Sequence, residues 1–167
     1  MGFRIALALA LAGGAFQATH SFAADAPKTE AAVHRILNPS NLTWVNAPPS
    51  LPGGAKMAIL HGDPAASGLF AIRILLPAGY AVQPHWHPAD ENMTVISGEI
   101  SMGVGEKFDV SKGHELTAGA FSLMPAGLRH YVWSATGAVI QIHAMGPWGI
   151  TYVNPADDPR GPPPAAK

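Results

Sequence analysis

The sequence predicts an all-β protein with a single barrel or sandwich domain. Short β-like runs recur at regular intervals between residues 55 and 153, and turn residues separate them. After residue 54 we find neither a sustained helical period nor an internal repeat. The chain has 167 residues, of which 48% are hydrophobic, and this is enough for one domain with a hydrophobic core.

The expected strands follow one another along the chain in two groups, with a polar stretch between them. The first group is 56–60, 69–76, 81–87, 92–97 and 99–104, and the second is 120–124, 129–133, 138–145 and 149–153. The expected turns, such as residues 97–98 and 125–127, contain glycine or proline, which interrupt regular strands. Many short strands at this spacing are typical of a barrel.

Residues 1–23 are typical of a secretory signal peptide. Arg4 is their only charged residue, residues 5–12 form an apolar run too short to span a bilayer, and residues 21–23 supply small residues for a cleavage site. Cleavage after Ala23 would deliver the mature protein to the periplasm or to the outside of the cell. The alternative is an N-terminal membrane anchor or a buried strand.

Two further segments lie outside the expected barrel. Residues 24–54 are predicted to be an arm or linker, in which Trp44 and Val45 are the candidate anchors to the barrel. Residues 154–167 form a Pro-rich tail whose end is expected to be disordered. The barrel itself is therefore assigned to residues 55–153.

The composition argues against several classes of protein. The chain has no cysteine, which rules out disulfides and thiolate metal ligands. Ten basic and eleven acidic residues give a formal net charge of −1, which gives no support to nucleic-acid binding or to a polybasic lipid-binding patch. No stretch after the N-terminal segment is long and apolar enough for a membrane, so none is expected as a partner after cleavage.

Two segments carry histidine, glutamate and glycine at spacings typical of a metal site. Residues 79–98 read G-x5-H-x-H-x3-E-x6-G, and residues 119–130 read G-x5-P-x-G-x2-H. Residues two apart in a strand point to the same side, so His85 and His87 would face one interior. Tyr131 directly follows His130, so the same alternation turns its side chain away from that interior.

Three imidazoles and one carboxylate suit borderline divalent metals, namely iron, manganese, nickel, copper or zinc. The candidate ligands are His85, His87, Glu91 and His130. Four protein ligands on an octahedral metal would leave about two positions for water, substrate or dioxygen. The sequence does not distinguish among the five metals.

Both segments resemble the two signature motifs of the cupin superfamily. The resemblance covers residues 79–134 directly, and the strand pattern extends it over roughly residues 55–153. It implies a cupin-type double-stranded β-helix, or jelly-roll barrel, with metal ligands at His85, His87, Glu91 and His130. Where the family often has asparagine, this chain has Ser134. That asparagine is not a metal ligand, so the difference concerns hydrogen bonding within the barrel.

Other polar residues are weaker candidates for a functional role. Gln141 and His143 share one face of an expected strand, and His143 would bind substrate or shuttle protons if that face lines the cavity. The alternative is a surface or interface histidine. His61 and His114 lie beside turn residues and should be solvated, and Asp90 is expected in a turn. Five large apolar residues are expected mainly in the core: Phe70, Met93, Met102, Phe121 and Trp133.

Cupins that resemble this chain include dioxygenases, decarboxylases, isomerases, lyases and binding domains, so the fold does not determine the function. The resemblance favours an exported dioxygenase-like enzyme, with iron favoured, that acts on a small organic acid or diketone-like compound. Glu91 would stay a ligand or act as a base. The alternatives are a non-catalytic metal- or small-ligand-binding or sensing module, and a structural barrel with a stabilising metal. A homodimer is expected, with Trp148 and the arm as candidate contacts.

Overall fold

The computed structural model describes residues 34–161. The predicted signal segment, the first part of the predicted arm and the end of the tail lie outside the described residues. From Ile36 onward the chain forms one compact unit. Within residues 34–161, no helix is long and apolar enough to cross a membrane.

The described residues form ten strands and three short 3-10 helices, with no α-helix among them. The strands are β1 (Val45–Asn46), β2 (Lys56–His61), β3 (Gly68–Leu76), β4 (Tyr80–Trp86), β5 (Glu91–Val104), β6 (His114–Thr117), β7 (Phe121–Met124), β8 (His130–Ser134), β9 (Ala138–Gly146) and β10 (Thr151–Tyr152). The 3-10 helices are η1 (Pro39–Asn41), η2 (Val110–Lys112) and η3 (Pro155–Asp157). The prediction of an all-β barrel is confirmed.

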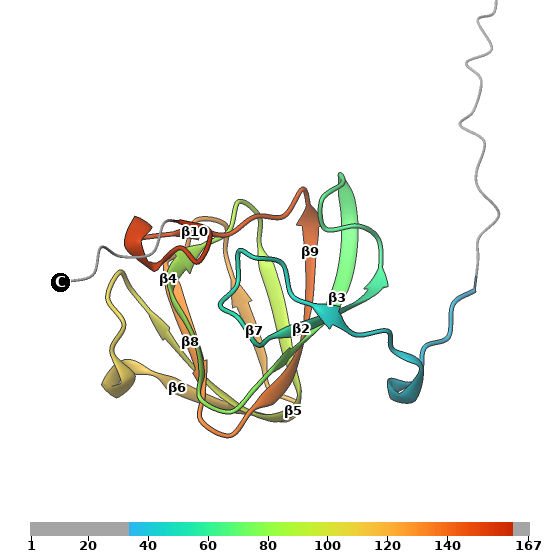
Figure 1. The fold of residues 1–167 in the computed structure, drawn as a ribbon, viewed down its shortest axis with the longest axis horizontal. Helices are drawn as coiled ribbons and strands as arrows, with labels where there is room; N and C mark the ends of the chain where they lie inside the picture. The colour runs from blue at the N-terminus through green and yellow to red at the C-terminus, as the bar shows by residue number, and fades with distance from the viewer. Residues whose placement is uncertain (1–33, 162–167) are drawn as a thin grey trace, which may run out of the picture. The chain divides into compact units, whose positions relative to one another are not determined.

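Two antiparallel sheets share the long strand β5 and curl over each other into a barrel (Figure 1). In one sheet the order is β1-β2-β3-β9-β5, with β7 on the other side of β5. In the other it is β10-β4-β8-β5, with β6 beyond β5. The first half of β5 therefore belongs to one sheet and its second half to the other, and the strand brings both walls around a common interior.

The interior is apolar because the strands alternate as expected for a sheet with one buried face. In β9, Ile140 and Ile142 are 4% and 5% exposed, and they pair with Ile74 and Ile72 of β3. Burial of such a side chain contributes about 1.5–3 kcal/mol. The residues between them on β9 consequently face outward.

One expected turn is wrong. Residues 97–98 lie inside β5, where the pairing with β9 shifts between Val95 and Ser97. Gly98 has φ +73°, and a Cβ at this position would overlap the Gly137 carbonyl. The glycine expected to end a strand thus lies just after a β-bulge, at the point where β5 passes from one sheet into the other.

The second group of strands differs from the prediction at two places. Strand β6 was not predicted, because its residues are mostly exposed and show no apolar alternation. Phe121, expected in the core, is 60% exposed on the outer side of β7. Phe70, Met93 and Met102 are buried as expected.

Part of the predicted arm belongs to the barrel wall. Val45 pairs through its backbone with β2, although its side chain is 50% exposed. The Tyr80 hydroxyl donates to the Pro52 carbonyl at 2.7 Å, and the Tyr152 hydroxyl donates to the Ser50 carbonyl at 2.8 Å. Burial raises the pKa of Tyr80 to about 12, so this hydroxyl keeps its proton and remains a donor. Two buried tyrosines therefore hold the arm over one end of the barrel.

Candidate metal centre

A bulge in β4 determines which way its histidines face. Between Val82 and His85, three residue steps of β4 lie opposite two of β8. Without the extra residue, alternation from the buried Val82 would turn Trp86 inward and both histidines outward. With it, His85 and His87 are 4% and 7% exposed inside the barrel, whereas Trp86 is only half-buried.

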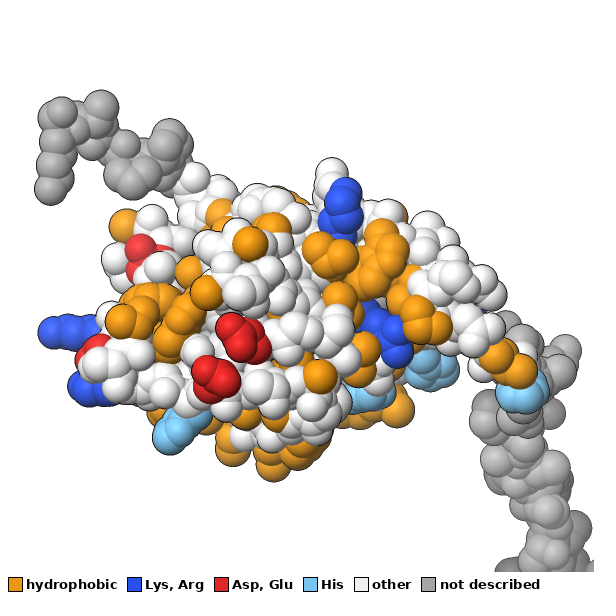
Figure 2. Space-filling view, turned by 90° about the horizontal axis from the view of Figure 1, so that it is seen from below, with side chains coloured by type: hydrophobic (Ala, Val, Ile, Leu, Met, Phe, Trp, Pro, Cys, Tyr) orange, Lys and Arg blue, Asp and Glu red, His pale blue; other side chains and the backbone are white. Residues whose placement is uncertain are grey.

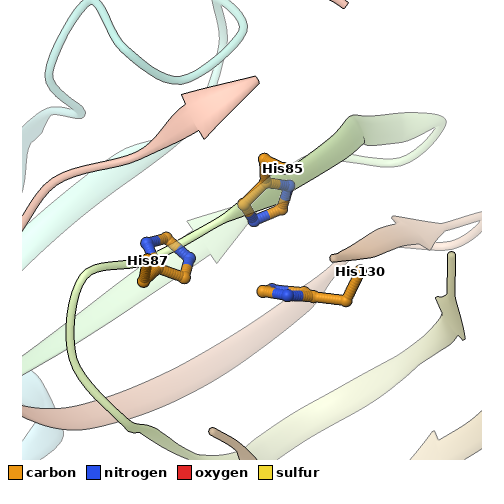
Figure 3. Close-up of side chains that lie close together, drawn as sticks. All are labelled: His85, His87 and His130. Atoms are coloured by element: carbon orange, nitrogen blue, oxygen red, sulfur yellow. The ribbon is translucent and has the colours of Figure 1, made fainter. Parts of the chain in front are cut away.

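Each of the three histidines is oriented by a hydrogen bond from Nδ1 to a backbone carbonyl. The pairs are His85 with Gln83 at 2.7 Å, His87 with Gly149 at 2.7 Å, and His130 with Leu128 at 3.0 Å. A carbonyl only accepts, so in the neutral imidazole Nδ1 carries the proton and Nε2 keeps its lone pair. The rings turn toward one shared space (Figure 3), and their ligand atoms lie within 4.8 Å of one another.

Glu91, the first residue of β5, completes the cluster. Its Oε2 lies 3.2 Å from Nε2 of His87 and 3.5 Å from Nε2 of His130. Yet this buried oxygen accepts no hydrogen bond of ordinary geometry from the described residues. Neutral imidazoles held by Nδ1 would point lone pairs at the carboxylate, which is unfavourable in a buried site. A cation between these atoms would satisfy all of them, so the residues fit a metal ion.

The electrostatic environment favours the ligand form of these groups. Burial, reinforced by His130 and His87, lowers the pKa of His85 to about 3, so its imidazole is neutral at physiological pH. Burial pushes the pKa of Glu91 upward, but the adjacent His130 and His87 outweigh burial and hold that pKa below its ordinary range. Metal ligands must be neutral imidazoles and ionised carboxylates, and His85 and Glu91 meet these conditions.

The segment after β9 supports His87 from the side. The Trp148 ring stacks on the His87 imidazole with a centroid distance of 4.1 Å and an interplanar angle of 15°. The Trp148 amide donates to the Pro64 carbonyl at 2.7 Å, and the next residue, Gly149, supplies the carbonyl that accepts from His87. Sequence analysis did not assign this role to Trp148, because no spacing rule connects residues so far apart.

The turns that carry the ligands are tied to each other. The Asp90 carboxylate accepts from the Ala126 amide at 2.8 Å, which joins the turn before Glu91 to the turn after β7. In the same region the Gly127 amide donates to the His87 carbonyl at 2.9 Å. Asp90 is thus a turn residue, as expected, and it helps to hold the ligands in register.

The cluster forms one wall of a cavity of about 350 Å³. The other walls are mainly apolar and include Met93, Met102, Val132, Ile140 and Ile142. Apart from the four candidate ligands, the polar side chains on the lining are Ser50, Asp63 and Trp148. The arrangement combines a candidate metal centre with enclosed apolar space for a small molecule.

The structure does not bring His143 to this cavity. Ile140 and Ile142 face the interior, so His143 lies on the outer face of β9, with its Nε2 3.5 Å from the Gln141 amide nitrogen. The predicted catalytic role of His143 depended on a position in the cavity, and this condition is not met. His61 and His114 are exposed, in agreement with their expected solvation.

Ser134 is fully accommodated at the position where cupins often have asparagine. It is 2% exposed, its hydroxyl donates to the Glu99 carbonyl at 2.6 Å, and it accepts from the Gly137 amide at 2.9 Å. A single hydroxyl therefore links β5 to the turn after β8. It takes no part in the metal centre.

Comparison with solved structures identifies the fold. Similar folds include the polyketide cyclase RemF from Streptomyces resistomycificus (15% identity, TM-score 0.62, 76% of this chain and 90% of that chain). A proposed acetylacetone dioxygenase from Methylibium petroleiphilum PM1 shares 20% identity with a TM-score of 0.59, over 79% of this chain and 89% of that chain. An RmlC-like cupin from Shewanella frigidimarina NCIMB 400 shares 18% identity with a TM-score of 0.52, over 68% of this chain and 91% of that chain.

At these identities the likeness establishes the fold, which is that of the cupins, and leaves the activity open. No curated protein shows significant similarity to the sequence. A family profile, in contrast, matches residues 17–151, which is most of the chain. This cupin-fold protein with a three-histidine site belongs to the family described as "Domain of unknown function (DUF4437)".

Proposed function

We propose that this protein is an exported, metal-dependent cupin enzyme, dioxygenase-like in its chemistry, that acts on a small organic acid or diketone-like compound. One observation carries the proposal. Three imidazoles converge on a buried Glu91 oxygen that has no hydrogen-bond partner among the described residues, at the wall of a cavity of about 350 Å³. A purely structural metal site would be closed, whereas these ligands line a space that admits a small molecule.

The side chains have separable tasks in this proposal. His85, His87 and His130 would hold the metal through Nε2, and Glu91 would add a fourth ligand that neutralises one of its charges. When bound, a divalent ion, with iron favoured and manganese, nickel, copper or zinc as alternatives, supplies a Lewis acid with positions for a chelating ligand and dioxygen. The mainly apolar walls would leave a bound molecule few polar partners other than the metal. Glu91 could also take up a proton from the substrate, since His143 lies outside the cavity.

The comparisons support an enzyme without identifying its reaction. RemF is a polyketide cyclase, and the Methylibium protein is a proposed acetylacetone dioxygenase, so this fold serves enzymes that act on small organic compounds. The second of these proteins is consistent with a diketone-like substrate for the present chain. Neither shares enough sequence to transfer an activity.

A non-catalytic binding or sensing module is the second candidate, and one observation favours it. Besides the four candidate ligands, the described lining offers only Ser50, Asp63 and Trp148 as polar side chains. An enzyme that moves protons usually places an acid or base near the reacting atoms. If Glu91 is committed to the metal, this cavity has few groups for that task.

Loading with iron tests the proposal directly. The protein, purified without a metal-binding tag, is loaded anaerobically with ferrous iron, and nitric oxide is added as a stand-in for dioxygen. An open site should give the electron-spin signal of a high-spin iron–nitrosyl complex, and bidentate oxygen ligands should perturb it. Stoichiometric iron that neither nitric oxide nor any such ligand reaches would contradict the enzyme proposal.

Export is a proposal based on residues 1–23. The mature protein should begin at or near Ala24 and should occur in the periplasmic or secreted fraction. Intact mass spectrometry of the protein from its native host decides this point. A soluble cytoplasmic protein that retains Met1 would contradict it.

We also propose a homodimer, although not through Trp148, which packs on His87 and Phe70. The support comes from exposed apolar side chains: Leu69 and Met145, which pair across β3 and β9, are 55% and 54% exposed. Figure 2 shows apolar side chains in several groups on the face that it views. Light scattering should give twice the monomer mass, and a monomer mass at micromolar concentration would contradict the dimer.

A further inference from the structure

Among residues 34–161, no lysine or arginine lines the cavity. The acidic residues of this described lining are Glu91 and Asp63. Arg73, on β3, is not part of the lining. Its Nε donates to the Gln141 side chain at 2.9 Å, and Gln141 lies on the outward face of β9, between Ile140 and Ile142. The histidines have already committed Nδ1 to backbone carbonyls. When Nε2 of each ring binds a metal the imidazoles are neutral, so in the loaded site the metal itself is the source of positive charge.

The charge balance then restricts the ligand. Asp63 is exposed, so water hydrates its carboxylate and it does not enter this balance. At the buried cluster, a divalent ion and the Glu91 carboxylate together leave one positive charge beside mainly apolar walls. A chelator that binds as a monoanion would cancel it, whereas a dianion would leave one uncompensated negative charge. Uncompensated charge is strongly unfavourable where water is excluded and the effective dielectric constant is low. Charge alone thus favours a ligand that binds as a monoanion over one that binds as a dianion.

The polarity of the walls adds a second restriction. A dicarboxylate such as oxalate keeps oxygens that the metal does not bind, and these oxygens need hydrogen-bond donors. The walls formed by Met93, Val132 and Ile140 offer none, and Ser50 and Trp148 are the neutral side chains on the lining with a donor. In the enolate of a β-diketone both oxygens bind the metal, and the rest of the molecule is apolar.

We propose that the cavity selects a largely apolar molecule that chelates through two oxygens as a monoanion, with β-diketones as the representative chemistry, and that it discriminates against dicarboxylates such as oxalate. The inference rests on the proposed metal site and narrows the substrate classes that the proposed function leaves open. The cavity volume of about 350 Å³ lies at the lower end of the range for small-molecule sites, so the ligand is small.

The test compares two probes on protein that is loaded with nickel and kept free of oxygen, so that chelation is measured without turnover. The probes are 1-phenyl-1,3-butanedione and oxalate, and their dissociation constants are measured by calorimetric titration. Metal content is determined before and after each titration, so that removal of metal by oxalate is not mistaken for binding. The diketone should bind at least about tenfold more tightly than oxalate, which corresponds to about 1.4 kcal/mol.

A matched pair of variants tests whether the missing cation causes this preference. Ile59 lines the cavity and is 45% exposed, so Ile59→Arg places a guanidinium at the rim without burying it. This change should shift the ratio of the two affinities toward oxalate by at least about tenfold. Val110→Arg adds the same charge at a position that is 64% exposed and outside the lining, and it should leave the ratio unchanged.

The outcomes separate this inference from the proposed function. Failure of the wild-type protein to hold nickel overturns both. Stoichiometric nickel with oxalate bound as tightly as the diketone, or with neither bound, overturns the inference and leaves the metal site intact. The wild-type ratio is informative by itself, so a poorly folded Ile59→Arg protein does not remove the test.

Discussion

The two faces of strand β8 have opposite kinds of packing, although their residues alternate along one short segment. On the outer face Tyr131 is fully buried, and its ring centroid lies 5.0 Å from that of Phe108 and 6.0 Å from that of Trp133. The Tyr131 hydroxyl donates to the Asp109 carbonyl at 3.0 Å. On the inner face His130 points into a cavity of about 350 Å³ and lies beside a glutamate oxygen without a hydrogen-bond partner. The outer face is tightly packed, and its buried hydroxyl has a hydrogen-bond partner. The inner face lines a cavity and lies beside a buried oxygen that has no hydrogen-bond partner among the described residues.

The outer face leaves no spare volume. A Cβ at Gly103 would overlap the Tyr131 ring, and a Cβ at Gly113 would overlap the Trp133 ring. Close packing of this kind contributes stability but offers no room for a ligand. The difference shows that β8 supports the fold with one set of side chains and the candidate chemistry with the other. Substitutions on the two faces should therefore have separable effects.

The largest expected effect is on the outer face. Tyr131→Ala removes a fully buried ring and leaves a cavity among tightly packed aromatic side chains, which should lower the free energy of unfolding by about 3–5 kcal/mol. Urea denaturation of the metal-free protein measures this loss. The folded fraction should still bind metal in the same stoichiometry. A folded Tyr131→Ala protein without metal would show that the two faces are coupled after all.

The next effect is on the inner face and concerns metal affinity. His130→Ala removes one of the candidate ligands, so the dissociation constant for a divalent metal should rise by more than about 100-fold, beyond the effect of losing a supporting residue. Added metal should raise the midpoint of thermal unfolding of the wild type but not of the variant, because a ligand that binds only the folded state stabilises it.

The matched control for His130→Ala is Val132→Ala, another inner-face residue of the same strand that lines the cavity. It should lose stability by removal of apolar contacts and yet keep its metal. Full metal occupancy in His130→Ala would show that the ligand assignment is wrong.

The inner face should also make stability depend on pH. The pKa of His85 is lowered to about 3 in the folded metal-free protein from an ordinary value of 6.5, so between these values the unfolded chain binds a proton that the folded chain does not. Stability should therefore fall as the pH falls through this window. The pKa of Glu91 is also lowered in the folded protein. Stability should therefore fall further as the pH falls below 4.5, the ordinary pKa of glutamate.

Urea denaturation of the metal-free protein at about pH 7 and about pH 5 measures this dependence. The wild type should lose more stability between the two conditions than His85→Gln, which lacks the titrating ring. Tyr131→Phe changes only the outer face and should keep the wild-type pH dependence. Equal losses in the wild type and His85→Gln would rule out this cause.

The sequence was sufficient to predict the barrel and the proximity of the four candidate ligands, whose role in metal binding stays a prediction. Apolar alternation indicates strands, and the resemblance to the two cupin motifs implies that His85, His87, Glu91 and His130 converge. Alternation alone also predicts that His85 and His87 share a face. It does not predict which face, since the bulge after Val82 reverses the phase of β4.

The remaining differences arise from contacts between distant parts of the chain. The face of His143 was undecided, because the packing of β3 and β5 against β9 determines which side is buried. Gly98 was interpreted as a turn, because a glycine with positive φ serves equally in a turn and in a bulge. The contact of Trp148 with His87 brings together two segments that no local pattern connects.

The smallest expected effect tests the contact between Trp148 and His87, by comparing two tryptophans that lie near His87. Trp86 lies directly between His85 and His87 in the chain but is turned away from the cavity, whereas Trp148 stacks on His87 at 4.1 Å. Trp148→Ala should therefore weaken metal binding by about tenfold, because the His87 ring loses a supporting contact that fixes its orientation. Trp148→Phe should recover most of the affinity, and Trp86→Ala should leave it unchanged even if it lowers stability. Competition with a chromophoric chelator measures all three affinities. If Trp86→Ala and Trp148→Ala weaken metal binding equally, the Trp148 ring acts through the stability of the barrel and not through its contact with His87. In that case the contact in space would predict metal affinity no better than the position of Trp86 next to His87 in the sequence.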